Sequence, residues 1–172
     1  MQNEPNTIYK LIVLYMLDKV QIPLTNRIIS EYVLGKEYTN YFNLQTAFTE
    51  LLDEQMIAID MTYKTTYYHL TDKGKETLTL FQSQLSPEIR DEIEHFLKEN
   101  HYSIIEEVGT FTDYRVLPTG DYESTCALKE NGHTLMELKI TTSSEDEAAK
   151  ICASFSEKNE SIYQYLIQHL LS

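Results

Sequence analysis

The sequence predicts an α+β protein built in two parts, because the spacing of its apolar residues changes period four times along the chain. Helix-like spacing of three to four residues covers 7–55 and returns at 72–98 and 144–171. The two-residue spacing of strands covers 56–71 and 102–142. The predicted order is α-α-α-β-β-α, then a bridging helix, and then β-β-β-α-α, a three-stranded antiparallel sheet covered by two helices.

Three short helices are predicted before residue 56. Each predicted segment places its apolar residues at i, i+3, i+4, i+7 and i+8, which lines them up on one helix face. The three segments are 7–19, 24–36 and 43–55. We expect Asn6 or Thr7 to cap the first helix and Thr25 to cap the second, with Gly35 as the stop signal of the second.

The stretch "YYHLTDKGKETL" (residues 67–78) predicts a strand that passes directly into a helix. It follows an earlier strand at 56–61, so the two strands form a hairpin. Thr71 is the expected N-cap of the helix, and Asp72 follows in the first turn, where the helix dipole favours a negative charge. The buried side of this fourth helix is predicted to hold Leu78, Leu80 and Phe81.

The spacing Tyr68-x-Leu70-Thr71-x-x-Gly74 resembles the pattern that closes the β-wing in the MarR and PadR families of bacterial repressors. Tyr68 and Leu70 share one face of the strand and are expected to pack inward. Gly74 is expected to allow a close approach of the helix to the wing. Three helices followed by a hairpin is also the layout of a winged helix-turn-helix, so the resemblance covers residues 7–82 and implies DNA binding.

The C-terminal half is predicted to begin with a bridging helix from Ser86-Pro87-Glu88 to Lys98, which starts with a serine cap, a proline and an acidic residue. Three strands follow, with Asn131-Gly132 as a tight hairpin turn between the last two. The strands are expected within 102–118, 122–130 and 134–142. Ser144 and Glu147 have the spacing of a capping box that opens the first of two final helices.

The complete order resembles an uncharacterised family of bacterial proteins regarded as transcription regulators, with a winged helix and a C-terminal α/β domain. The predicted domains are a winged helix at 1–85, a bridging helix at 86–101 and an α/β domain at 102–172. The resemblance implies no established activity. We expect the C-terminal domain to dimerise, to bind a small-molecule effector or to dock another protein.

A winged helix implies that the third helix enters the DNA major groove while the wing lies near the backbone. Asparagine and glutamine can read adenine edges, threonine can contact a thymine methyl group, and lysine can bind phosphate. The predicted DNA-binding residues are Asn43, Gln45, Thr46 and Thr49 on the helix, Tyr63, Lys64 and Thr65 at the wing, and Arg27 and Lys36 beside the groove. A solvated helix face is also polar when it binds nothing. The hydroxyl groups of Tyr38, Tyr41 and Tyr63 could bond phosphates, or the rings of these residues could instead cover the junction of the third helix with the wing.

The distribution of charge argues against strong DNA binding. The net charge is −13, of which −3 falls in residues 1–82 (seven basic, ten acidic) and −10 in residues 83–172 (seven basic, seventeen acidic). Phosphate neutralisation supplies most non-specific affinity for DNA, so an acidic protein begins at a disadvantage. The alternative is therefore a protein-interaction module in which the winged helix does not bind DNA.

Neither catalytic nor metal-binding chemistry is predicted, so we expect no enzyme, no cofactor and no metal. The five histidines lack ligand spacing, and no Cys-x-x-Cys motif or glycine-rich phosphate loop occurs. Glu106 and Glu107 are adjacent in a predicted strand, where their side chains would point to opposite faces. Cys126 and Cys152 are interpreted as buried free thiols of a cytoplasmic protein, with a disulfide as the less favoured alternative.

The remaining predictions concern partners. The longest apolar segment is too short to cross a bilayer and the N-terminus lacks a basic leader region, so we expect no membrane partner. Bacterial winged-helix regulators are usually two-fold dimers, which implies a homodimer. The sequence does not decide which surface forms the dimer interface. The two alternatives are the bridging helix at 87–98 and the final helix, whose apolar stripe includes Ile162, Leu166 and Leu170.

Overall fold

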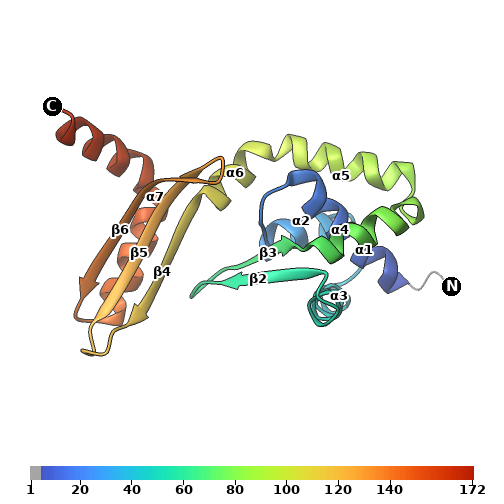
Figure 1. Ribbon diagram of the computed structural model, residues 1–172, viewed down its shortest axis with the longest axis horizontal. Helices are drawn as coiled ribbons and strands as arrows, with labels where there is room; N and C mark the ends of the chain where they lie inside the picture. Colours follow the sequence, from blue (N-terminus) through green and yellow to red (C-terminus); the bar gives the residue numbers. More distant parts are fainter. Residues whose placement is uncertain (1–4) are drawn as a thin grey trace. The chain divides into compact units, whose positions relative to one another are not determined.

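A computed structural model of the protein describes residues 5–172 and confirms the α+β class. Within that range it contains seven α-helices and two three-stranded antiparallel sheets (Figure 1). The chain divides into two compact units, and the division falls between Ile104 and Ile105. Each unit is described by itself. No helix in this range is both long enough and apolar enough to cross a membrane.

The N-terminal unit is built around helix α1, which has no solvent side along its middle. All seven residues from Leu11 to Leu17 are buried, where the sequence predicted one apolar stripe. Helices α3, α4 and α5 and strand β3 all pack against it. The elements of this unit are α1 (Pro5–Val20), β1 (Leu24–Thr25), α2 (Asn26–Gly35), α3 (Tyr41–Asp53), β2 (Ile57–Met61), β3 (Thr66–Leu70), α4 (Asp72–Phe81), a 3-10 turn (Gln82–Gln84) and α5 (Pro87–Glu99).

The first sheet has the strand order β1-β3-β2, with Tyr68 of β3 at its centre. Tyr68 is opposite Leu24 on one side and Ile59 on the other, and its ring stacks on Phe48 of α3 at 4.4 Å between centroids. This confirms that Tyr68 packs inward. Strand β1 was not predicted, because a strand of two residues is too short to show an alternating pattern.

The junction between β3 and α4 forms as the sequence predicted. The hydroxyl oxygen of Thr71 accepts the backbone N–H of Gly74 at 3.1 Å and donates to the carbonyl of Met56 at 2.9 Å. Leu78 is buried, whereas Leu80 is 74% exposed, so the prediction for Leu80 was wrong. Residues two apart are separated by about 200° around a helix, and Leu80 therefore cannot share a face with Leu78.

Two helix ends differ slightly from the prediction. Helix α1 begins at Pro5, before the predicted caps Asn6 and Thr7. Thr25 caps α2 as expected, by accepting the N–H of Ile28 at 3.3 Å. Gly35 is the last residue of that helix. The left-handed backbone conformation that follows belongs to Glu37, at φ 55°.

Residues 101–109 form a helix, α6 (His101–Gly109), where a strand was predicted. The β-branched pair Ile104-Ile105 favoured a strand, but only Ile104 is buried, and its N–H bonds the carbonyl of Asn100 as in a helical turn. Consequently Glu106 and Glu107 are helical neighbours and do not alternate across a sheet. A Cβ on Gly109 would lie 2.8 Å from the carbonyl oxygen of Lys129, which explains a glycine where the helix ends.

The C-terminal unit is a meander of strands with the order β4-β5-β6 and one helix against its face (Figure 1). Its core contains Cys126, Met136, Cys152 and Phe155. The elements are β4 (Thr110–Val116), β5 (Tyr122–Glu130), β6 (His133–Thr142) and α7 (Glu145–Leu170). Asn131 and Gly132 both have positive φ and form the predicted two-residue turn between β5 and β6.

Helix α7 is one continuous helix of 26 residues, so the prediction of two final helices was wrong. The polar segment 158–161 suggested a break, but it contains neither glycine nor proline. The Asn159 amide donates to the carbonyl of Ser156 at 3.1 Å, and the Ser161 hydroxyl donates to that of Lys158 at 3.0 Å. Ser144 caps the helix as expected by accepting the N–H of Glu147.

Candidate nucleic-acid interface

The outer face of α3 carries the predicted base-reading residues. Asn43, Thr46 and Thr49 are exposed and three residues apart, so they follow one another along the helix. Gln45 is half-buried, and its side-chain nitrogen is buried without a hydrogen-bond partner within residues 5–172. The structure therefore brings Asn43, Thr46 and Thr49 together and leaves Gln45 at the margin of this face.

The three exposed side chains offer different chemistry. The hydroxyl groups of Thr46 and Thr49 donate to the carbonyls of Phe42 and Gln45, at 3.1 and 3.0 Å. Their methyl groups and remaining lone pairs are available to a partner. The N–H of Asn43 bonds the cap residue Asn40 at 2.9 Å, so the first turn of α3 is held in place. This arrangement could accept hydrogen bonds and cover methyl groups, but it holds no positive charge.

The tip of the β2–β3 hairpin places the three predicted wing residues together. The turn is closed by the N–H of Thr62, which donates to the carbonyl of Thr65 at 2.8 Å, and by the N–H of Thr65, which donates to the Thr62 hydroxyl at 3.1 Å. Lys64 is exposed, with its ammonium group 5.6 Å from the centre of the Tyr63 ring. Across residues 5–172, no carboxylate lies within ion-pair distance of Lys64.

The two cations predicted to flank the groove are engaged with carboxylates of this chain. Arg27 contacts Glu31 at 2.6 Å, one helical turn away. Lys36 lies 3.8 Å from Glu92 of α5, and the Tyr38 hydroxyl also donates to Glu92. Binding a phosphate through Arg27 or Lys36 would therefore require these contacts to be exchanged, which offsets part of the gain.

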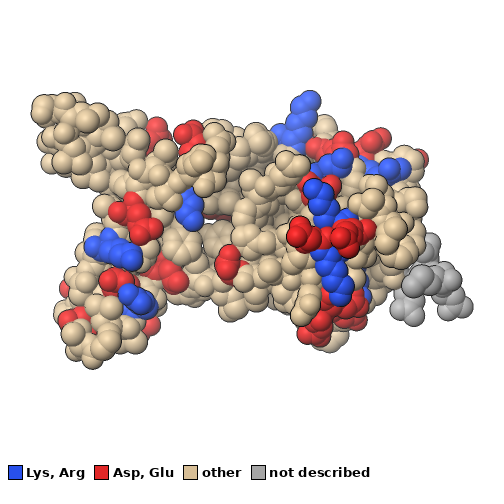
Figure 2. All heavy atoms as spheres, in the orientation of Figure 1, with Lys and Arg blue, Asp and Glu red and all other residues tan. Residues whose placement is uncertain are grey.

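Acidic and basic side chains alternate elsewhere in the N-terminal unit as well. Lys10 bridges Glu50 at 2.6 Å and Glu54 at 3.4 Å, which ties α1 to the later turns of α3. Burial lowers the pKa of Lys10, but hydrogen bonding to Glu50 and the nearby charge of Glu54 outweigh it, so the pKa is raised overall. On the face drawn in Figure 2, Lys and Arg side chains lie beside Asp and Glu and form no continuous basic strip.

Exposed apolar residues occur on the same two elements, α3 and the hairpin, and the sequence did not indicate most of them as functional. Tyr41 and Phe42, in the first turn of α3, are 62% and 76% exposed, and Met61 of β2 is 68% exposed. Ile59, opposite Tyr68 in the hairpin, is 37% exposed. In Figure 1 the hairpin extends past α3, and the exposed side chain of Met61 lies on the distal part of β2. Large exposed apolar groups become evidence of a binding surface when they form a contiguous patch.

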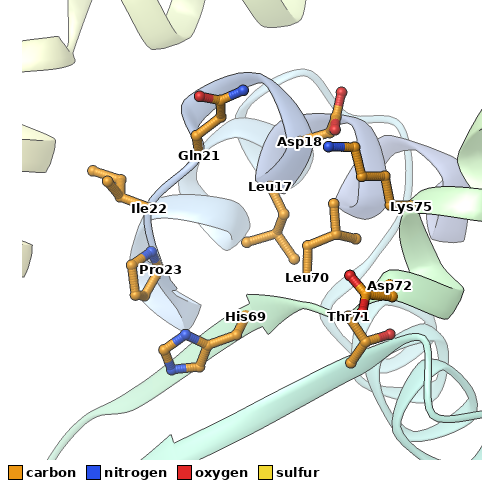
Figure 3. Close-up of a pocket in the computed structure, with 10 residues that line it drawn as sticks. All are labelled: Leu17, Asp18, Gln21, Ile22, Pro23, His69, Leu70, Thr71, Asp72 and Lys75. Carbon is orange, nitrogen blue, oxygen red and sulfur yellow. The ribbon is translucent and has the colours of Figure 1, made fainter. Parts of the chain in front are cut away.

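A pocket of about 360 Å³ lies elsewhere on the N-terminal unit, between the end of α1 and the start of α4. Figure 3 shows Asp18 and Lys75 on one side of it and His69 and Pro23 on the other. None of the predicted DNA-binding residues lines this pocket. It is therefore separate from the candidate interface. Within the described residues, no cluster of three or more His, Cys, Asp or Glu side chains could hold a metal ion.

Comparison with known proteins identifies the family of the chain. No curated protein and no solved structure matches the sequence. A family model described as a domain of unknown function, DUF4364, matches residues 9–170. This match includes both units of the structure and nearly the whole chain. The protein therefore belongs to the DUF4364 family.

Proposed function

We propose that the N-terminal unit is a winged helix-turn-helix that binds duplex DNA through α3 and the β2–β3 hairpin. The element order supports this proposal, because a short strand joins the first two helices, and a third helix leads into a hairpin. The strand β1 adds to the hairpin beside β3, which anchors the proposed wing to the helices. The Tyr68, Thr71 and Gly74 contacts support the resemblance to the wing-closing pattern of bacterial repressors.

The observation that carries the proposal is the uncharged face at the start of α3. Residues 41–49 contain no carboxylate, and Asn43, Thr46 and Thr49 point away from the core. An asparagine amide can pair with an adenine edge, and threonine can contact either a thymine methyl group or a polar base edge. In this proposal α3 lies in the major groove, and Lys64 reaches the backbone from the tip of the hairpin.

Few phosphate contacts are available to this interface. Lys64 has no carboxylate partner within the described chain, whereas Arg27 and Lys36 contact Glu31 and Glu92. The number of neutralised phosphates sets the slope of affinity against salt, at about 0.9 per phosphate. We therefore expect a shallow salt dependence that corresponds to two or three phosphates, and modest affinity for non-specific DNA.

A second candidate function is a protein-interaction module that uses the same surface. The exposed side chains of Tyr41, Phe42 and Met61 favour it, because aromatic residues and methionine are enriched in protein interfaces. The ion pairs of Arg27 with Glu31 and of Lys36 with Glu92 also favour it, because they leave these two cations less available to phosphate. In this alternative the hairpin and the start of α3 contact an apolar partner surface, and nucleic acid is not bound.

A titration with mixed duplex fragments at about 50 and about 200 mM salt separates the two candidates. For the DNA-binding domain we expect measurable binding at the lower salt concentration. Lys64→Glu should weaken it about tenfold or more at any sequence, since a phosphate contact becomes a repulsion. Lys158→Glu is the matched control, because it makes the same charge change on the C-terminal helix α7. Absence of binding at the lower salt concentration would leave the protein-interaction module as the better explanation.

Asn43→Ala tests the base-reading role separately from the charge. This variant should keep its non-specific affinity and its salt slope but lose discrimination at one base pair, by about 1–3 kcal/mol. Selection from a random duplex library with the wild type and with Asn43→Ala would measure this. A library that shows no sequence preference for the wild type would contradict the assignment of α3 as the reading helix.

A further inference from the structure

Strand β6 is an edge of the second sheet, and its outer side has no strand partner within the described chain. It spans ten residues in the order β4-β5-β6 and contains neither proline nor glycine. The register with β5 shifts near Leu128 and Lys129, and from Met136 to Thr142 the pairing is regular. Every second residue of this seven-residue stretch directs its N–H and C=O away from β5, and such a row of unpaired groups is a template for another strand.

We propose that two copies of this chain pair antiparallel through β6, so that the two meanders form one six-stranded sheet. The two-fold axis passes through Leu138, perpendicular to the sheet. Such an interface is isologous, since each copy contributes the same strand. The proposal concerns the C-terminal unit alone and does not depend on whether the N-terminal unit binds DNA.

Charge selects this register. With the axis at Leu138, Glu137 of each copy is opposite Lys139 of the other, so two pairs of opposite charge form on one face. A shift of the axis to Lys139 would place two lysines opposite each other, and a shift to Glu137 would do the same for two glutamates. Both side chains are exposed, and their neighbours across β5, Ala127 and Thr125, are uncharged.

The same register joins apolar residues on the face that carries α7. Met136 would be opposite Ile140 of the second copy, and the two Leu138 side chains would meet at the axis. Helix α7 packs chiefly on β4 and β5, and it leaves Ile140 at the β6 margin 41% exposed. Leu138 is partly buried against the core that contains Cys126. Pairing through β6 would extend that core across the axis and cover this margin.

The test uses the chain of 172 residues and two single charge variants of it, Glu137→Lys and Lys139→Glu. Either variant converts both cross-strand pairs to like charges, which should weaken the homodimer about tenfold or more. The double variant restores two opposite pairs and should dimerise as the wild type does. Light scattering after gel filtration would measure the mass of the wild type and of each variant at several protein concentrations in the micromolar range.

An equimolar mixture of the two single variants gives the sharpest result. One variant then contributes two lysines and the other two glutamates, so a heterodimer should form although neither homodimer is stable. Circular dichroism verifies that each variant is folded. If a variant fails to fold, wild-type hydrogen exchange decides, because the outward amide groups of Met136–Thr142 should exchange more slowly at high than at low concentration.

Three results would overturn the proposal. The first is a wild-type chain that stays monomeric throughout the concentration range. The second is a dimer whose mass is unchanged in both single variants, which would place the interface elsewhere. The third is an equimolar mixture of the two single variants in which light scattering detects no heterodimer.

Discussion

Gly74 and Met56 lie so close that a Cβ on the glycine would be 2.0 Å from the methionine carbonyl oxygen. Helix α4 and the start of the hairpin therefore meet backbone to backbone. The same carbonyl accepts the hydroxyl of Thr71 and the N–H of the same residue, at 2.9 and 3.2 Å. This contact attaches the hairpin to the rest of the N-terminal unit.

Gly74→Ala should lower the free energy of unfolding by about 1–3 kcal/mol, because the added methyl group must displace backbone on both sides. Gly35→Ala is the matched control, since nothing lies within 4 Å of a Cβ at the end of α2. The control should be neutral or slightly stabilising. Chemical denaturation of the two variants measures the difference, and equal stabilities would contradict the contact.

Thr71→Ala should cost about 1 kcal/mol, because the variant loses the cap on α4 and leaves the N–H of Gly74 without its partner. Thr71→Ser keeps the hydroxyl and should recover most of this loss. Thr79→Ala, on the exposed side of the same helix, removes a hydroxyl that bonds only its own helix backbone and should change stability little. A Thr71→Ser variant as unstable as Thr71→Ala would assign the effect to the methyl group.

Phe48→Ala and Phe42→Ala compare the two sides of one helix. Phe48 is 2% exposed and stacks on Tyr68, so its removal should cost about 3–5 kcal/mol. Phe42 is 76% exposed, and its removal should change stability by less than about 0.5 kcal/mol. Thermal unfolding of both variants tests the orientation of α3. Similar losses would mean that the first turn of α3 is packed.

The two cysteines should be unreactive toward a thiol reagent at neutral and mildly alkaline pH while the protein is folded. Burial, together with neighbouring Cys152, raises the pKa of the Cys126 thiol to about 12, so almost no Cys126 thiolate exists below pH 10, and the side chain of Cys152 is fully buried. Denaturant should release two reactive thiols per chain. Rapid reaction of the native protein at pH 8 would contradict the burial of these side chains.

Much of the fold follows from local sequence patterns, and the exceptions have identifiable causes. Thr71 could be predicted as a cap because a cap depends on residues within one turn. Helix α6 was missed because Ile104 and Ile105 are β-branched, which outweighed the four-residue spacing of Ile104 and Val108. The continuity of α7 was missed because polar residues at 158–161 resembled a connection, although no residue there breaks a helix.

The candidate site likewise contains features that follow from local spacing and a contact that only tertiary packing creates. The positions of Asn43, Thr46 and Thr49 follow from the leucine stripe on the other side of α3. Arg27 and Glu31 are four residues apart on a helix, so their pairing could have been foreseen. Lys36 and Glu92 lie 56 residues apart in the sequence, and only the packing of α5 brings them together.

The position of α1 has a consequence during protein synthesis. This helix is enclosed by elements that come later in the chain, and its Tyr15 hydroxyl donates to Glu94 of α5. Helices α3 and α4 and strand β3 are made before α5, so until α5 has left the ribosome, which takes on the order of ten seconds for eighty residues, the segment Leu11–Leu17 lacks the cover of α5. A chaperone that recognises apolar segments would have access to this part of the newly made chain only for that interval, because the docking of α5 completes the burial of Leu11–Leu17.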